Sequence, residues 1–332
     1  MTLDGHRARL AELLRRMKGI RVLVLGDLVA DEYVYGETRR VSREAPVLIL
    51  QRVGGKVIPG GAGNAVLNVA ALGGVPVPVG IVGPGATADR LVAEFERRGI
   101  ETASIVRDSV RPTVRKTRVM AGGAHGQKQQ VLRIDEADEA PVSSEAEEAL
   151  LARGVEWARQ ADAVILSDYG YGTLTDRVIE EVLAVANARG LPVCADSRYR
   201  LRAFRGVTFA TPNEEEAAQA VGGDPGQDHG QVADRLRERL NASFALVTRG
   251  RDGMIVSEGS SAPVEIPAWG EAEAADVTGA GDTVAATTTL AIAAGASPAD
   301  AARLASITAG IVVTKHGAAT TTPGEVARLA GL

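Results

Sequence analysis

Short apolar runs alternate with helix-length segments along most of the chain. RVLVLGD, DAVILSDYG and FALVTRG are strand-length, and each ends in Gly, Asp, Ser or Thr. Segments with helical spacing lie between several such runs, at Thr87–Arg98, Thr175–Ala188 and Gln231–Leu240. Strands that are apolar throughout must be covered on both faces, as in a parallel sheet between two helical layers. The pattern therefore predicts an α/β fold with a central, mostly parallel sheet flanked by helices.

The ends of these runs predict where a ligand would bind. In parallel sheets, ligands bind beyond the carboxyl ends of the strands. The polar residues at the ends, Asp27, Asp168, Asp196 and Thr248, are therefore expected to crowd one edge of the sheet. A Rossmann dehydrogenase would need GxGxxG after the first strand, and GDLVAD stands there instead.

Two regions break the alternation. Residues 33–53 and 112–135 alternate apolar and polar side chains without intervening helices, which indicates antiparallel strands with one wetted face. We interpret them as a small sheet that forms a lid or a dimer surface on a single domain, residues 1–332. An isolated lid would expose an apolar face, so we expect a homodimer through it.

Composition excludes several classes of protein. The net charge of −5 and the pI near 5.6 give no electrostatic footprint for nucleic acid. The single cysteine, Cys194, cannot form a disulfide within the chain, and we expect a buried thiol and a cytoplasmic location. Apolar runs are cut by Gly and Pro, so no membrane span is predicted. Helical spacing of Leu10, Leu13 and Met17 indicates an amphipathic first helix rather than a signal peptide.

The stretch DVTGAGDT, residues 276–283, has the glycines of an anion-binding loop but no lysine. An apolar helix starts near Gly281, and N–H groups at a helix start favour anions. A Walker P-loop would need GxxxxGK[ST], which this stretch lacks. Asp282 then has two interpretations, a general base beside an anion hole or an ordinary helix cap.

Two other stretches suit a polyhydroxylated ligand. In GGAGN, Gly60 and Gly61 precede Asn64 and a helix, so the stretch is either a turn capped by Asn64 or a backbone platform for substrate. In GDLVADEY, Asp27 and Asp31 could bind sugar hydroxyls or a metal. The absence of nearby His or Cys argues against a transition metal.

Two stretches suit a nucleotide. In TPNEEE, Asn213 and Glu216 are three residues apart at a helix start. They either organise hydrated Mg²⁺ near phosphates or only complement the helix dipole. VTRGRDG is a hairpin signal, and in an ATP site its Thr248 and Gly250 would lie near phosphate or ribose.

In this order along the chain, GGAGN, TPNEEE, VTRGRDG and DVTGAGDT resemble the ribokinase (PfkB) family of carbohydrate kinases. The resemblance extends roughly from Arg21 to Leu329. It implies a ribokinase-like fold with a small β-sheet lid, and ATP and Mg²⁺ as cofactors. Asp282 matches the family's catalytic base. The residues that match its anion hole are Gly279, Ala280 and Gly281.

The same resemblance assigns the remaining site residues. Asn213 and Glu216 match the pair that organises Mg²⁺. The positions that match nucleotide contacts are Asn213, Thr248, Gly250 and, near the adenine, Ser306. The positions that match sugar contacts are Asp27, Asp31, Gly60, Gly61, Asn64 and Arg133. The family often binds a monovalent cation such as K⁺, and the matching positions are Asp276, Thr278, Lys315 and Gly317.

Within the family, GDLVADEYVYGETRRVSREAPVLILQ and KQQVLRID are similar to the D-glycero-β-D-manno-heptose 7-phosphate kinases. The chain departs from that group at Tyr171, where lysine is usual, at DSRY instead of DPKG, and at Ser306, where asparagine is common. The residues that could bind a substrate phosphate, or simply be solvated strand faces, are Arg39, Arg40, Lys116, Arg118 and Arg133.

The sequence thus predicts ATP-dependent phosphotransfer to a hydroxyl of a sugar or sugar phosphate, with heptose 7-phosphate as the first candidate. One alternative is a kinase of the same family for another small sugar, a nucleoside or a sugar acid. An alternative of another class is a nucleotide-binding protein without phosphotransfer, with the lid as an interface.

Overall fold

The structure is a computed structural model that describes residues 3–122, 128–138, 142–223, 228–259, 261–270 and 274–332. Within these ranges the main element is an eight-stranded sheet in the order β14-β13-β12-β11-β10-β9-β1-β4. Neighbours from β4 to β12 run parallel, whereas β13 and β14 are antiparallel. The strands are β1 (Arg21–Gly26), β4 (Val75–Val79), β9 (Ala163–Asp168), β10 (Val193–Ser197), β11 (Phe209–Ala210), β12 (Phe244–Thr248), β13 (Met254–Ser257) and β14 (Val264–Ile266).

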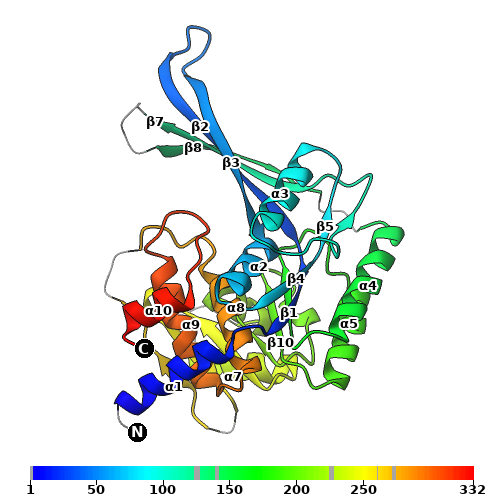
Figure 1. The fold of residues 1–332 in the computed structure, drawn as a ribbon, viewed down its shortest axis with the longest axis vertical. Helices are drawn as coiled ribbons and strands as arrows, with labels where there is room; N and C mark the ends of the chain where they lie inside the picture. The colour runs from blue at the N-terminus through cyan, green and yellow to red at the C-terminus, as the bar shows by residue number, and fades with distance from the viewer. Residues whose placement is uncertain (1–2, 123–127, 139–141, 224–227, 260, 271–273) are drawn as a thin grey trace.

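Both faces of this sheet are covered by helices, as the apolar runs predict (Figure 1). In β1, Val22 and Val24 belong to one core and Leu23 and Leu25 to the other. The first core is closed by α1 (Leu3–Arg16), α2 (Ala62–Ala71), α3 (Ala86–Glu96), α8 (Ala280–Ala293), α9 (Pro298–Val312) and α10 (Pro323–Ala330). The second is closed by α4 (Ser144–Ala158), α5 (Asp176–Ala188), α6 (Glu214–Val221) and α7 (His229–Leu240).

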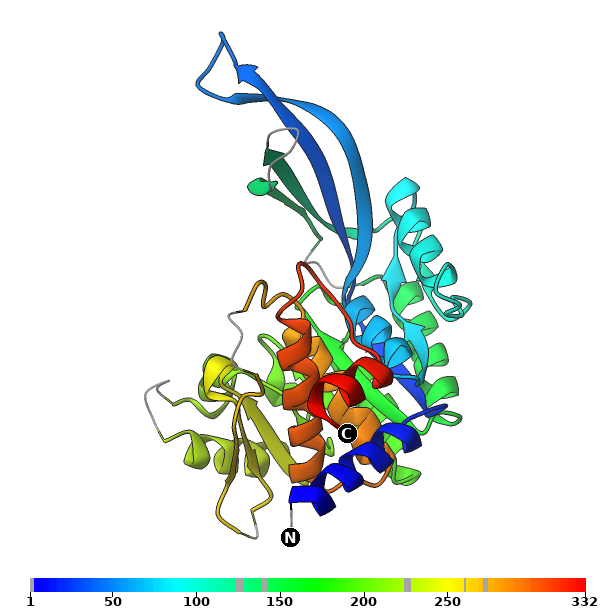
Figure 2. The same cartoon turned by 60° about the vertical axis from the view of Figure 1, so that its left-hand side comes forward.

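A second, four-stranded sheet rises from this body (Figures 1 and 2). Its strands are β2 (Leu28–Val41), β3 (Leu48–Gly61), β7 (Val114–Gly122) and β8 (Gln129–Glu136). The pairs β2–β3 and β7–β8 are antiparallel, but β2 and β7 pair in parallel. The expectation of purely antiparallel strands was wrong at this pair, because each hairpin starts from the same edge of the main body. Residues 123–127 of the predicted segment lie outside the described residues.

Only Asp27 separates the end of β1 from the start of β2. The small sheet therefore begins directly at the carboxyl edge of the main one. Gly60 and Gly61 are the last residues of β3, not a free turn, and α2 begins at once with Gly61 as its N-cap. A Cβ on Gly60 would lie 2.3 Å from Oδ2 of Asp31. Glycine at this position lets the Asp31 carboxylate sit against the backbone.

The rest of the chain follows the predicted hairpin and packing. β12 pairs antiparallel with β13 across the short helix η2 (Gly250–Asp252), and Cys194 is fully buried. The apolar run after β4 leaves the main sheet, since β5 (Ile81–Val82) pairs with β6 (Val106–Arg107) instead. A further short helix, η1, spans Leu201–Ala203. In the described part of the chain, no helix has both the length and the apolar character needed to cross a bilayer.

The stacked rings of Phe209 and Phe244 join β11 to β12 in the first core, with centroids 4.7 Å apart. Because Phe244 is 2% exposed, we expect Phe244→Ala to lower the free energy of unfolding by about 3–5 kcal/mol. Urea unfolding followed by circular dichroism measures this. Val110→Ala, at a side chain that is 85% exposed, is the matched control and should change it by less than about 0.5 kcal/mol. A wild-type midpoint for Phe244→Ala would contradict the assigned packing.

Candidate active site

A cavity of about 520 Å³ lies between the carboxyl edge of the main sheet and the base of the small sheet. As the strand ends predict, Asp168, Asp196 and Thr248 gather at this edge of the sheet, and all three line the cavity. The predicted site residues that line the cavity are Asp31, Gly60, Gly61, Asn64, Arg133, Asn213, Glu216, Thr248, Thr278, Gly279, Gly281 and Asp282. Those that do not are Asp27, Ala280, Gly250, Ser306, Asp276, Lys315 and Gly317.

Asp282 lies in the first turn of α8 and is 3% exposed. Its carboxylate accepts a hydrogen bond from Nδ2 of Asn64 at 2.8 Å and another from the hydroxyl of Tyr169 at 2.9 Å. It is not the helix cap, since Gly279 holds that position with a φ of 80°. A side chain there would meet Nδ2 of Asn64 at 2.3 Å, so the Asn64 contact requires glycine. Asn64 likewise caps no helix and instead holds the carboxylate.

Opposing effects set the pKa of the Asp282 carboxyl close to neutral pH. Burial raises the pKa of its carboxyl, the hydrogen bonds from Asn64 and Tyr169 lower it, and the charge of Asp31 raises it again. The result is a pKa of about 6. A carboxylate with such a pKa is ionised at neutral pH and basic enough to accept a proton from a hydroxyl.

The start of α8 presents free backbone donors beside this carboxylate. Among the described residues, no backbone carbonyl accepts from the N–H groups of Gly281 and Asp282, and α8 has no side-chain cap. Such groups form an anion site at a helix N-terminus. The N–H of Ala280 differs, because it donates to the carbonyl of Val277. Of the three residues that match the anion hole, Gly279 and Gly281 therefore keep N–H groups with no acceptor among the described residues, and Asp282 adds another.

The small sheet contributes one acid and several cations to the cavity. Arg118 donates to Asp31 at 2.5 Å, and Arg133 pairs with Asp135. Lys116 is 9% exposed and lies over the rings of Tyr169 and Tyr171, at 5.8 and 5.4 Å from their centres. Burial lowers the pKa of the Lys116 ammonium. A polyhydroxylated or anionic ligand would meet these groups from the lid side.

Asp27, which matches a sugar-binding position of the family, does not line the cavity. Its carboxylate is 1% exposed and accepts hydrogen bonds from the backbone N–H groups of Tyr169, Tyr171 and Thr173. These bonds occupy both oxygens and turn them away from the cavity. Asp27 thus clamps the loop after β9, and that loop carries Tyr169 to Asp282.

The opposite side of the cavity is built by the start of α6 and the end of β12. Asn213 caps α6 and forms a capping box with Glu216, and it bridges to Thr248. Two positions that match nucleotide contacts, Gly250 and Ser306, do not line this cavity. Gly250 lies in η2 beyond the cavity wall, and Ser306 on α9 donates to the carbonyl of Pro267 at 2.8 Å. Neither position could be placed from sequence, because both depend on how separate segments pack.

The carboxylates on this side fit a hard cation. One oxygen of Glu216 accepts from the N–H of Asn213, and burial raises the pKa of the Glu216 carboxyl. Burial, and then the charges of Asp282 and Glu216, raise the pKa of Asp196. A cation held by these oxygens, directly or through water, would offset that excess of negative charge. Within the described residues, no cluster of three or more His, Cys, Asp or Glu forms a metal site.

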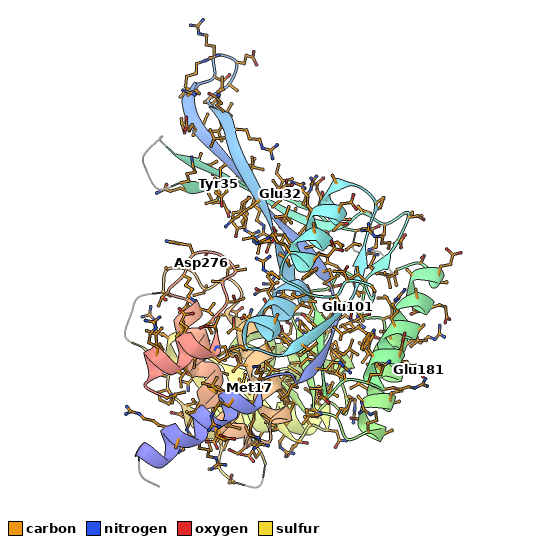
Figure 3. All side chains as sticks on the ribbon, in the orientation of Figure 1. Met17, Glu32, Tyr35, Glu101, Glu181 and Asp276 are labelled. Carbon is orange, nitrogen blue, oxygen red and sulfur yellow. The ribbon has the colours of Figure 1, made fainter. Side chains whose placement is uncertain are left out.

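The predicted monovalent-cation residues form a loop contact. The Asp276 carboxylate accepts from the N–H groups of Thr278 and Gly317, both at 2.9 Å, and so joins the loop before α8 to the loop after α9. The Nζ of Lys315 donates to the carboxylate of Glu325 instead, so the Lys315 side chain takes no part in this loop contact. Asp276 lies on the part of the body that faces the small sheet, which carries Glu32 and Tyr35 (Figure 3).

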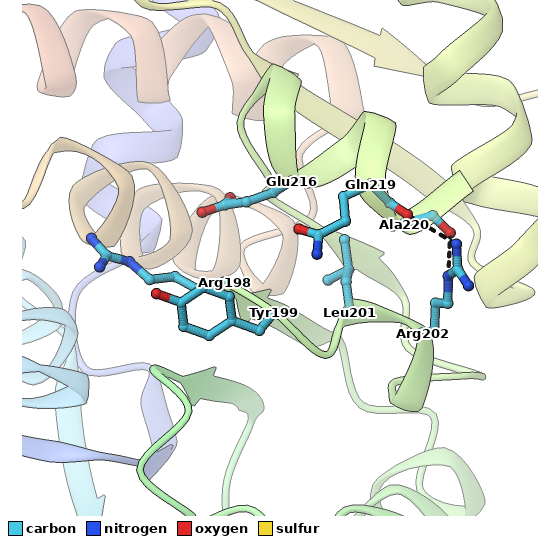
Figure 4. A pocket seen from close by; sticks show the side chains of 7 residues that line it. All are labelled: Arg198, Tyr199, Leu201, Arg202, Glu216, Gln219 and Ala220. Atoms are coloured by element: carbon cyan, nitrogen blue, oxygen red, sulfur yellow. Dashed lines mark hydrogen bonds between the residues drawn. The ribbon is translucent and has the colours of Figure 1, made fainter. Parts of the chain in front are cut away.

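Sequence reasoning assigned no role to several side chains that line the cavity, among them Tyr169, Asp196 and Arg198. Asp196 was expected only at the edge, and Arg198 only as a departure from a family pattern. The sequence could have indicated all three by their position, because each lies at or next to the end of β9 or β10. Arg198 also borders a smaller, adjoining cavity with Tyr199 and Glu216 (Figure 4).

The model of the pfkB family carbohydrate kinases matches residues 21–324. The chain therefore belongs to the pfkB family of carbohydrate kinases. It is 42% identical over 325 residues to the bifunctional protein HldE of a Caulobacter species, a match that covers 97% of this chain and 65% of the relative. The HldE protein of Pelobacter propionicus is 38% identical over 96% of this chain. The chain thus spans slightly less than two thirds of these relatives, 65% of their length.

Solved structures confirm the predicted ribokinase-like fold. Arabidopsis thaliana ribokinase, complexed with ribose and ATP, superposes with a TM-score of 0.71 at 21% identity and covers 95% of this chain and 99% of its own. Phosphofructokinase-2 from Escherichia coli, in complex with potassium, superposes with a TM-score of 0.73 at 18% identity and covers 95% of this chain and 98% of its own.

The raised pKa of Asp282 has a consequence for stability. Because its folded pKa of about 6 exceeds the ordinary value of 3.8, the folded state binds the proton more tightly, and stability falls as pH rises from about 4 to 6. We expect Asp282→Asn to be more stable than the wild type at pH 8, by on the order of 2 kcal/mol, with the difference shrinking towards pH 4. Urea unfolding at both pH values measures this. Glu181→Gln, at an exposed carboxylate, is the control. Equal stabilities at pH 8 would contradict the raised pKa.

Proposed function

We propose that this chain transfers the γ-phosphoryl group of ATP to a hydroxyl of a sugar phosphate, with D-glycero-β-D-manno-heptose 7-phosphate as the acceptor and C1 as the site of transfer. The observation that carries the proposal is the buried Asp282 carboxylate, with its pKa of about 6, beside the free N–H groups at the start of α8. The proposed compartment is the cytoplasm, where ATP is made.

The geometry supports a direct, in-line transfer. The acceptor hydroxyl gives its proton to the Asp282 carboxylate as its oxygen bonds to the γ-phosphorus. The bond from that phosphorus to the bridging oxygen breaks, and its electron pair leaves with ADP. The N–H groups of Gly281 and Asp282 stabilise the charge on the transferred group. Asn64 and Tyr169 hold the carboxylate oriented towards the cavity throughout.

The proposed Mg²⁺ would be held, directly or through water, by Glu216, Asp196 and Asn213, which all line the cavity. When bound there, it would neutralise phosphate charge. For a monovalent cation such as K⁺, support comes from the lowered pKa of Asp276. Burial raises this pKa, but the hydrogen bonds from Thr278 and Gly317 lower it by more. An ionised carboxylate is thereby kept next to the start of α8.

Two observations support a phosphorylated heptose. The chain's similarity to the HldE proteins extends over most of its length, and its lid segments resemble the heptose 7-phosphate kinases. In addition, Lys116, Arg118 and Arg133 reach the cavity from the lid and suit an anionic substituent. Arg39 does not, because it bonds Gln51 at the far end of the small sheet. Asp31 supplies a buried acceptor for sugar hydroxyls.

The test is release of ADP by wild type and Asp282→Asn, with heptose 7-phosphate and a panel of sugars and sugar phosphates, with and without K⁺. We expect the highest kcat/KM on heptose 7-phosphate. In Asp282→Asn, kcat should fall by about 10²- to 10⁴-fold, because the proton acceptor is lost. Glu181→Gln, at an exposed side chain of α5 that does not line the cavity, should keep wild-type rates.

Binding of ADP, measured by calorimetry, should be retained in Asp282→Asn and shows that the variant is folded. Near-normal turnover by this variant would reject the proposed base. Turnover of another acceptor in preference to heptose 7-phosphate would retain the kinase and reject the substrate. Binding of ATP without turnover on the whole panel would favour a nucleotide-binding protein.

We propose further that the chain forms a homodimer through the small sheet. Several apolar side chains of β2, β3, β8 and the β2–β3 turn are solvent-exposed, and a partner would cover them. They are Val41, Val47, Leu48, Val53, Val131, Leu132 and Ile134.

Leu132 is 53% exposed, and we expect Leu132→Glu to shift sedimentation from dimer to monomer, because a buried carboxylate would oppose association. The control is Leu329→Glu on α10, at a side chain that is 44% exposed and outside the small sheet. Sedimentation velocity at micromolar concentration measures both variants. A monomeric wild type would reject the dimer.

A further inference from the structure

Arg198 occupies the middle of the carboxyl edge of the main sheet. It directly follows β10, the strand between β9 and β11, and its N–H donates to the carbonyl of Asp168 at 3.1 Å. Its side chain borders both the large cavity and the adjoining one of about 210 Å³ (Figure 4). On the β9 side stand the residues proposed for the acceptor, and on the β11–β12 side stand Asn213 and Thr248. Arg198 therefore lies where the two halves of a transfer reaction would meet.

The cations of the cavity differ in what holds them. Arg118 is paired with Asp31, and Arg133 with Asp135. The guanidinium of Arg198 has no ion pair or hydrogen bond to any residue that the structure describes. Instead, its central carbon lies 5.2 Å from the centre of the Tyr169 ring. An aromatic face holds a guanidinium in place while its N–H donors remain available.

Carboxylates surround Arg198 without engaging it. Burial raises the pKa of Asp282, Asp196 and Glu216, and the charge of Arg198 lowers all three in part. Yet none of these carboxylates comes within the 4.0 Å of an ion pair with its guanidinium. A carboxylate paired with this guanidinium, as Asp31 is paired with Arg118, would have neutralised its charge. The fold leaves this guanidinium without a directly bonded carboxylate among the described residues, beside the proposed base and the start of α8.

We propose that Arg198 is a catalytic residue that binds the transferred phosphoryl group in the transition state. The inference rests on the proposed function and adds a residue to it. The acceptor oxygen loses its proton to Asp282 and bonds to phosphorus, while the bridging oxygen leaves with ADP. Arg198 forms no covalent bond. Its planar fork of N–H donors contacts the outer phosphoryl oxygens, to which the N–H groups of Gly281 and Asp282 also donate.

The first experiment compares Arg198→Ala and Arg198→Lys with Arg202→Ala. Arg202 borders the same small cavity, but its guanidinium donates to the carbonyls of Gln219 and Ala220 at the end of α6. We expect kcat of Arg198→Ala to fall by about 10²- to 10³-fold, with smaller changes in KM for ATP and acceptor. Arg198→Lys should recover part of the rate, added guanidinium should partly rescue Arg198→Ala, and Arg202→Ala should keep wild-type kcat.

The second experiment needs no acceptor sugar. Calorimetry measures binding of ADP and Mg²⁺ with and without aluminium fluoride, which mimics a phosphoryl group in transfer. The wild type should bind the fluoride complex more tightly than ADP alone, and Arg198→Ala should lose most of that gain while it binds ADP normally. This outcome supports Arg198 even if no tested sugar is phosphorylated, in which case only the proposed substrate fails. Retention of the gain in Arg198→Ala, or of wild-type kcat, would overturn the inference.

Discussion

One buried carboxylate organises the centre of this protein. Asp282 is fixed by Asn64 from α2 and by Tyr169 from the loop after β9, so three separate segments converge on it. Each contact has its own requirement. Gly279 must be glycine because Asn64 passes where its side chain would be, and Asp27 must hold the loop that presents Tyr169. The position of the small sheet follows, since Asp27 is also the single residue between β1 and β2.

The acidic and basic side chains of the cavity are arranged in a way that suits anionic ligands. Burial raises the pKa values of Asp282, Asp196 and Glu216, and the charges of nearby carboxylates add to the shifts of Asp282 and Asp196. Two cations, Lys116 and Arg198, are held by tyrosine rings rather than by acids. Aromatic faces position these charges without neutralising them. A phosphate group would thus find positive charge on the lid side and in the middle of the sheet edge.

The contiguous motifs were the parts of the site that could be predicted. Asp282 with the glycines before it, and Asn213 with Glu216, are each set by one helix start, and helix starts have local signals. The contacts that local signals could not indicate are those whose partner comes from elsewhere in the chain. Asp27 points into a backbone loop more than 140 residues away, Ser306 bonds a carbonyl outside the cavity, and the N–H of Ala280 is already taken by Val277. Tyr169 and Arg198 carry no motif of their own and were not assigned.

By itself, the sequence determined the α/β architecture, the presence of the small sheet and the edge at which the polar residues gather, because periodicity and strand ends are local properties. It also placed the chain in its family through motifs in a fixed order. Only the tertiary structure decided which side chains are free to act. Whether Asp27 or Asp31 faces the cavity, and whether Arg118 or Arg198 is left without an acid, depends on contacts between segments far apart in sequence. Burial and pairing set the pKa and availability of each group, and both are properties of the packed molecule.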